Sequence, residues 1–172
     1  MKTLKIISII AVTALTACAG MKPINESDRT FSRVVEVEGS SKTEIYSGTK
    51  IWLAEHFNSA EAVIDHDNEK DGVIIGNGII DYPCQPSSCF GTSHWGVSFK
   101  IKTEIKENRF KLTFTNVNIR IPASVNAGYY SRSSIIPMNT QSQLNDIKPA
   151  LLAFGDDIRN NITTNKASTS DW

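Results

Sequence analysis

The sequence predicts an α+β domain in which two helices lie on one face of an antiparallel sheet of about five strands. Three observations support this fold class. Apolar and polar residues alternate strictly over residues 97–105, two longer segments repeat apolar residues at helical spacing, and the predicted elements follow the order β-α-β-β-β-β-α. A period of two is typical of an antiparallel strand with one wet face, and a period near 3.6 indicates an amphipathic helix. The 172 residues suit one domain and are short for two.

The first three predicted strands cover residues 31–37, 62–66 and 73–82, where β-branched and apolar residues cluster. Gly76 and Gly78 lie on one face of the third strand. Glycine within a strand indicates a bend or close packing by a large side chain, so we expect one of these here.

A hairpin then joins residues 97–105 to residues 110–121 through a short polar turn. The apolar phase of the second strand slips by one residue between Phe114 and Val117. A β-bulge near Thr115-Asn116 would absorb this slip, because one extra residue returns the apolar side chains after it to the core face of the sheet.

Two amphipathic helices complete the prediction. Ser41 and Glu44 form a capping-box pattern, so a helix should begin at Ser41. Its apolar stripe contains Ile45, Thr49, Trp52 and His56, flanked by Tyr46, Leu53 and Phe57. The stripe of the second helix contains Leu144, Ile147, Leu151, Gly155, Ile158 and Ile162. Pro149 either lies in the first turns of this helix or kinks it.

The domain organisation follows from these elements. Residues 1–17 are interpreted as a signal peptide, 18–29 as a polar tether, 30–165 as the single domain and 166–172 as a polar tail. Residues 122–139 have no sustained period and contain two prolines, so we expect a long loop. Such a loop in a compact domain is functional or mobile.

The N-terminus has the layout of an export signal. Lys2 and Lys5 precede an apolar run of ten residues at 6–15, and small residues follow up to Cys18. The run is about half as long as the ~20 residues of a membrane-spanning helix. The alternative, a buried N-terminal strand or helix of the domain, does not explain this three-part order.

The segment Leu15-Thr16-Ala17-Cys18 resembles the lipobox of bacterial lipoproteins. The resemblance implies that the chain is cut before Cys18 and that this cysteine is acylated. Several acyl chains, each contributing about 0.8 kcal/mol per buried CH₂, hold a protein on a bilayer almost permanently. Residue 19 is Ala rather than Asp, and by resemblance to Gram-negative sorting this favours the outer membrane.

Cys84 and Cys89 remain as an even pair once Cys18 is assigned to lipid. The oxidising compartment favours a disulfide between them, which would contribute about 2 kcal/mol by closing a small loop. The alternative is a metal site formed by Cys84, Cys89 and His94. A structural zinc site usually has a second ligand pair of similar spacing, which is missing here, so we predict no metal.

One stretch of the chain carries a more specific resemblance. It comprises SSKTEIYSGTKIWLAEHF, the strand DGVIIGNGIIDY and the hairpin VSFKIKTEIKENRFKLTFTNV. Together these segments, over residues 30–125, resemble a bacterial envelope domain of unknown function with a fold like that of the TATA-binding protein. The resemblance implies this TBP-like fold and supplies no catalytic or binding residues.

The sequence disfavours catalysis and nucleic-acid binding. It contains no G-x-S-x-G elbow, no H-E-x-x-H motif and no Walker loop. Eighteen Lys and Arg balance 18 Asp and Glu, and loss of Lys2 and Lys5 with the leader leaves 16 against 18. Nucleic-acid binders usually carry a concentrated basic surface instead. We therefore predict no catalytic residues, no cofactor and no nucleic-acid partner.

The leading hypothesis is a lipid-anchored, non-enzymatic envelope protein that binds another envelope protein or ligand. Aromatic and arginine side chains on loops are typical of interfaces. The candidate contact residues are Phe90, His94, Trp95, Tyr129, Tyr130 and Arg132. The alternative for these residues is local packing over the sheet edge. A second hypothesis is a small-ligand or lipid carrier with an apolar cavity lined by Trp52, Phe99 and Phe114, and a third is metal binding.

Overall fold

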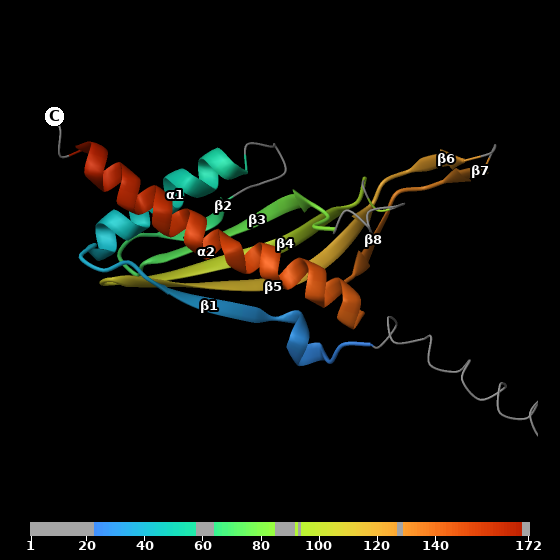
Figure 1. Cartoon of the computed structure of the whole chain (residues 1–172), viewed down its shortest axis with the longest axis horizontal. Coiled ribbons are helices and arrows are strands. Elements are labelled where there is room, and N and C mark those ends of the chain that lie inside the picture. Colours follow the sequence, from blue (N-terminus) through green and yellow to red (C-terminus); the bar gives the residue numbers. More distant parts are fainter. Residues whose placement is uncertain (1–22, 58–63, 85–91, 93, 127–128, 170–172) are drawn as a thin grey trace, which may run out of the picture.

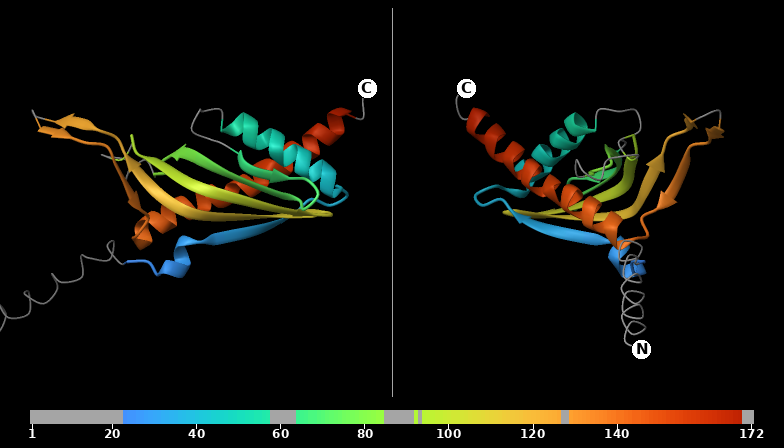
Figure 2. Two further views of the ribbon diagram at one scale, coloured as in Figure 1. Left: turned by 180° about the vertical axis from the view of Figure 1, so that it is seen from behind. Right: turned by 45° about the vertical axis from the view of Figure 1, so that its right-hand side comes forward.

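A curved antiparallel sheet with two helices on one face forms the domain (Figures 1 and 2). The computed structural model describes residues 23–57, 64–84, 92, 94–126 and 129–169. The strands are β1 (Phe31–Glu36), β2 (Ile64–Asn68), β3 (Val73–Asp81), β4 (Gly96–Lys106), β5 (Arg109–Ile121), β6 (Ser124–Asn126), β7 (Tyr129–Ser131) and β8 (Ser134–Pro137), and the helices are α1 (Lys42–His56) and α2 (Gln141–Thr169). The predicted α+β class is confirmed.

The sheet has six strands within the described residues. Five follow the order β1-β5-β4-β3-β2, and β8 pairs with the second half of β5, beyond the part that pairs with β1. The predicted loop at residues 122–139 is therefore wrong in part, because it contains β8 and the small β6–β7 hairpin. Strands of three or four residues contain too few alternations to give a period in the sequence.

The predicted bulge is present in β5. Ser98 pairs with Asn118, whereas Lys100 pairs with Thr115, so β5 uses one residue more than β4 over this interval. Asn116 adopts a positive φ of 52° there. Asparagine tolerates this left-handed conformation better than most residues. As a result Val117 is buried on the same face as Phe114, although the two positions are an odd number of residues, three, apart.

The capping box at the start of α1 is also confirmed. The Ser41 hydroxyl accepts a hydrogen bond from the Glu44 backbone N–H at 3.3 Å. The Glu44 carboxylate accepts one from the Ser41 backbone N–H at 2.7 Å. These two bonds satisfy donors that a helix N-terminus otherwise leaves unpaired.

Small residues bring the helices close to their neighbours. A Cβ on Gly155 of α2 would lie 2.6 Å from Val35 Cγ2 of β1, and one on Gly48 of α1 would lie 2.6 Å from Ile162 Cγ1 of α2. Both helices thus cover the same face of the sheet, and Figure 2 shows them on that side. Pro149 lies inside α2, beyond its first turn.

Aromatic rings fill the middle of the layer between sheet and helices. The Phe154 ring of α2 lies 5.2 Å from the Trp52 ring, 6.0 Å from that of Phe99 and 6.2 Å from that of Phe114, measured between centroids. The cavity that we expected to be lined by Trp52, Phe99 and Phe114 is therefore occupied by Phe154. The sequence could not show which residue of α2 faces this point.

The ordered domain includes part of the predicted tether. Ile24 is buried, its N–H donates to the Asn139 carbonyl at 3.1 Å, and Pro23 forms a β-bridge with Thr140. A short 3-10 helix follows at Glu26–Arg29. None of the helices in the described part of the chain is long and apolar enough to cross a membrane.

Candidate binding site at the loop end

Several strand ends meet at one end of the sheet, which we call the loop end. Asp81 at the end of β3 pairs with Gly96 at the start of β4, and Gly96 pairs with Arg120 near the end of β5. Ile121 in turn pairs with Ser134 at the start of β8. The antiparallel register therefore makes the β3–β4 connection and the β5–β8 connection leave the sheet beside each other. These two segments contain the candidate contact residues predicted from the sequence.

A groove of about 440 Å³ lies at the loop end. Its lining combines aliphatic side chains with hydroxyl and cationic groups: Ile79, His94, Gly96, Arg120, Ile121, Pro122, Ser133, Ser134 and Ile135. This volume is within the range of small-ligand sites, and such a mixture suits an amphipathic partner segment or ligand. The groove thus contains residues from both candidate segments.

The candidate residues of the β3–β4 connection have different environments. His94 is exposed and lines the groove. Trp95 is half-buried, and its ring packs edge-on against Tyr82 at 6.0 Å between centroids. The Tyr82 hydroxyl donates to Asp146 Oδ2 at 3.0 Å, which ties this connection to the first turns of α2. Burial is the main cause that raises the pKa of Tyr82, and the hydrogen bond to Asp146 raises it further. Trp95 is accordingly a packing residue, as the alternative interpretation stated.

The candidate residues of the β5–β8 connection lie on or next to the β6–β7 hairpin. This hairpin projects from the body of the domain (Figure 1). The backbone of Tyr129 pairs with Asn126, and Tyr130 pairs with Val125. The Tyr130 side chain is 69% exposed, and Arg132 is exposed as well. Neither is among the groove residues, whereas their neighbours Ser133 and Ser134 are.

Sequence reasoning missed Arg120, Ile135 and the two serines. Ile135 is 64% exposed although it belongs to a strand of the main sheet. The apolar pair Ile135-Ile136 within a segment assigned as loop was the one available signal. Arg120 gave none, because it occupies an ordinary polar position in the alternation of β5.

The cysteine loop lies mainly outside the described residues. Cys84 is half-buried just after β3, whereas Cys89 and Phe90 belong to the segment that is not described. The Cys84–Cys89 disulfide therefore stays a prediction. Among the described residues, no group of three or more His, Cys, Asp or Glu side chains is placed to hold a metal ion.

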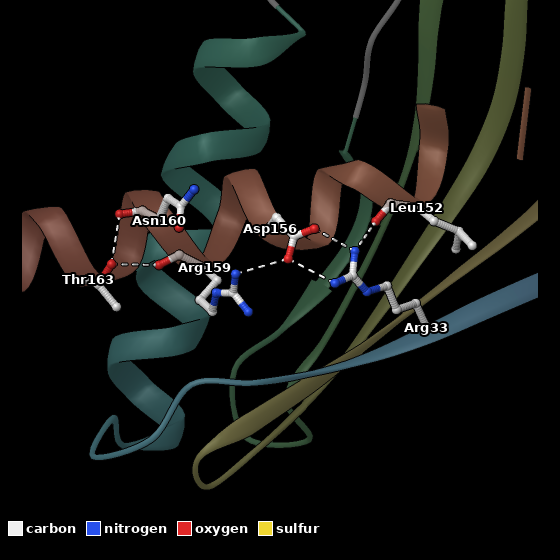
Figure 3. Close-up of polar contacts among 6 residues, drawn as sticks. All are labelled: Arg33, Leu152, Asp156, Arg159, Asn160 and Thr163. Carbon is white, nitrogen blue, oxygen red and sulfur yellow. Dashed lines mark hydrogen bonds and ion pairs between the residues drawn. The ribbon is translucent and has the colours of Figure 1, made fainter. Parts of the chain in front are cut away.

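A polar junction elsewhere in the molecule joins α2 to β1 (Figure 3). Both terminal guanidinium nitrogens of Arg33 donate to the Asp156 carboxylate, at 2.7 and 2.8 Å, and one of them also donates to the Leu152 carbonyl at 3.0 Å. Arg159 adds an ion pair to Asp156 at 3.0 Å. The hydrogen bonds from Arg33 hold the pKa of Asp156 below its usual value. Asp156 and its two arginine partners therefore form a structural contact that joins α2 to β1.

A further ion pair, supported by hydrogen bonds from Asn77, lies at the opposite sheet edge. Lys100 Nζ donates to Asp65 Oδ2 at 2.7 Å, and the Asn77 carboxamide donates to the same carboxylate at 2.9 Å. The hydrogen bond from Lys100 lowers the pKa of Asp65. His56 stacks on Trp52 with ring centroids 4.3 Å apart, so this histidine has a packing partner within α1.

The domain is an antiparallel sheet with two helices on one face, and its elements follow one another in the order given above. This architecture is that of the TBP-like α+β domains. The chain belongs to the family described as a domain of unknown function (DUF4468) with TBP-like fold, which matches residues 31–120. The resemblance that the sequence carries is thus confirmed for the domain.

Two solved structures share the fold. A TBP-like protein from Parabacteroides distasonis has a TM-score of 0.57 at 17% identity, covering 81% of this chain and 97% of its own. A DUF4468 family protein from Bacteroides ovatus has a TM-score of 0.51 at 14% identity, covering 83% of this chain and 88% of its own. Similarity at this level of identity concerns the fold alone. No curated protein matches the sequence.

Proposed function

We propose that this protein is a non-enzymatic binding module, anchored by lipid on Cys18 to the outer membrane of a Gram-negative cell, whose loop end binds another envelope protein. The observation that carries the proposal is the groove at the loop end, which contains residues from both candidate segments. The lipobox at residues 15–18 supports the anchor. The lack of catalytic sequence motifs supports binding rather than chemistry.

The chemistry of the loop end suits a protein partner. Tyr130 and Ile135 expose 69% and 64% of their surface, and Arg132 is exposed beside them. Tyrosine and arginine are enriched among the residues that dominate interfaces, because they combine a large contact area with hydrogen-bonding groups. The groove, which is lined by aliphatic and hydroxyl groups, accommodates one side chain of the partner. The hairpin and the groove therefore form one continuous candidate surface.

The short tether restricts where the partner is found. Only residues 19–22 separate Cys18 from Pro23, the first described residue, which forms a β-bridge with Thr140 of the domain. Five residue steps span at most about 18 Å even when fully extended. A domain anchored through Cys18 would stay close to the bilayer. We therefore expect a partner that is itself embedded in, or attached to, the same membrane.

Photo-crosslinking in intact cells tests this proposal. The full-length protein carries a photoreactive amino acid at Tyr130 or Ile135, and a matched variant carries it at Val34. Val34 is 55% exposed on β1, where it pairs with Lys111 away from the loop end. We expect a crosslink to one other envelope protein at Tyr130 and Ile135, and no crosslink to that protein at Val34. Absence of a specific product at both loop-end positions, or the same product at Val34, would contradict the proposal.

A further inference from the structure

The five strands in sequence across the main sheet end in two edge strands, β1 and β2, which differ in how far they are protected. β2 has a register shift between Ile64 and His66, and its two aspartates, Asp65 and Asp67, form ion pairs with lysines. Bulges and charged side chains are common means by which proteins protect a sheet edge from further pairing. β1 has six residues in unbroken register with β5 and contains neither a bulge nor a proline. Of these two edges, β1 is therefore the one open to another strand.

The hydrogen-bond pattern shows which backbone groups of β1 face outward. Val37, the residue after β1, donates its N–H to the Asn108 carbonyl at 2.7 Å and continues the register of β1 with β5. In an antiparallel pair only alternate residues exchange hydrogen bonds with the neighbouring strand. The N–H and C=O groups of Ser32, Val34 and Glu36 therefore point away from β5. Among the described strands β1 pairs with β5 alone, and it lies at the border of the sheet (Figure 1).

The side chains of these three residues are exposed as well. Val34 is 55% exposed at the middle of the strand, and Ser32 and Glu36 are exposed on either side of it. The alternate residues Arg33 and Val35 point to the other face, where they contact α2. The outward side of β1 thus presents a row of backbone donors and acceptors with an apolar side chain at its centre.

We propose that β1 pairs with β1 of a second copy of this chain, antiparallel and across a two-fold axis at Val34. This register uses all three outward-facing residues of both copies, and each hydrogen-bonded pair in it exchanges two backbone hydrogen bonds. It places Val34 opposite Val34, Ser32 opposite Glu36, and Arg33 opposite Val35 of the second copy. Within β1 no like charges are then opposed, whereas a shift that places Arg33 opposite Arg33 would be destabilising. The edge is therefore self-complementary, which a two-fold symmetric contact requires.

This contact is separate from the surface proposed to bind another envelope protein. No residue of β1 lines the groove at the loop end. A contact along one strand is smaller than a typical stable interface, so we expect a dimer that forms and dissociates reversibly. Two chains held on one bilayer would meet at a raised effective concentration, so the proposed lipid anchor would favour the pairing.

Photo-crosslinking between isotope-labelled and unlabelled chains tests the register. The full-length protein carries a photoreactive amino acid at Glu36, and the two kinds of chain are mixed in detergent before irradiation. Trypsin cleaves after Arg33 and so separates Ser32 from position 36. We expect mass spectrometry to find position 36 joined to the peptide that contains Ser32, in products that combine both kinds of chain. The same group at Ile51, which is 44% exposed on α1, is the control and should give no such product. Absence of the mixed product, or a product that joins position 36 to another element, would overturn the proposal.

Substitutions at the axis provide a second test, measured by sedimentation equilibrium of the full-length protein in detergent. Val34→Lys opposes two positive charges and should raise the dissociation constant of the dimer at least tenfold. Val34→Pro removes an outward N–H that β5 does not use, and it replaces Val34→Lys if that variant does not fold. Ile51→Lys adds the same charge on α1 and should leave the constant unchanged. Thermal unfolding verifies each variant. An unsubstituted protein that stays monomeric at every concentration, or folded Val34 variants that dimerise equally well, would overturn the proposal.

Discussion

Single side chains determine how closely the layers of this domain approach. Gly78 of β3 is an example, because the ring atoms Cζ and Cε2 of Phe99 occupy the place where a Cβ would be, at 2.6 and 2.8 Å. The glycine pattern of this strand predicts close packing by a large side chain or a bend at this point, and the structure identifies the rings of Phe99 and Phe57. An aromatic ring held in a close-packed core has little room to move. This position therefore accepts no side chain without rearrangement of its neighbours.

We expect Gly78→Ala to lower the free energy of unfolding by about 1–3 kcal/mol, the usual cost of overpacking a core. Chemical denaturation measures this change. The matched control is Gly96→Ala, in the neighbouring strand, where the nearest atom to an added Cβ is the Ile80 carbonyl oxygen at 3.4 Å. A cost for Gly78→Ala no larger than that for Gly96→Ala would contradict this explanation.

At the scale of elements, α2 is attached to the edge strand β1 by packing and by charge. Gly155 lets the helix approach Val35, and at the next position the Asp156 carboxylate accepts hydrogen bonds from both terminal guanidinium nitrogens of Arg33. The two side chains of this pair are 39% and 35% exposed. Water therefore screens the pair, and its contribution is at most about 1 kcal/mol.

We expect Asp156→Asn to reduce the free energy of unfolding by up to about 1 kcal/mol at neutral pH. The folded-state pKa of Asp156 lies below its usual value near 3.8, because Arg33 stabilises the ionised form. The contribution is thus complete above the unfolded-state pKa and disappears as the pH falls through the lower folded-state pKa.

Urea denaturation of both proteins at neutral pH and at about pH 2.5 measures this difference, which should shrink at the acidic pH. Asp157→Asn, at the next and exposed position of α2, is the matched control and should have little effect at either pH. A loss that is independent of pH, or equal in the control, would show that the ion pair is not its source.

At the scale of the whole molecule, the proposed anchor and the candidate binding surface are connected through β8. Pro23 and Ile24 pair with Thr140 and Asn139, which follow β8 in the chain. β8 begins at Ser134, one of the groove residues. A domain anchored at Cys18 would therefore hold its loop end within reach of other membrane components.

Replacement of Cys18, the residue proposed to be acylated, provides the test of this arrangement. If the proposal is right, Cys18→Ser moves the protein out of the outer-membrane fraction, because the thiol proposed to receive the lipid is absent. Ala19→Ser leaves that thiol in place and should remain in the membrane fraction. Cell fractionation followed by immunoblotting measures both. A Cys18→Ser protein that is processed normally and stays in the outer membrane would contradict lipid anchoring.

The sequence by itself determined the fold class, the order of the first five strands and the two helices, the start of α1 and the bulge in β5. These features are local: alternation sets which face is buried, the Ser41–Glu44 pair satisfies nearby helix donors, and the bulge is a slip of phase between Phe114 and Val117. The predicted apolar stripe of α2 is buried as expected, including Leu151 and Ile158. Each of these signals involves residues only a few positions apart.

The tertiary structure alone decided the strand β8, the contents of the core and the composition of the groove at the loop end. Phe154 fills the space expected to be a cavity, and Arg120, Ile135 and His94 line one groove at the loop end. These residues are far apart in the chain and carry no shared local pattern. They come together through the antiparallel register and the close packing of helices on the sheet, which depend on all the contacts at once.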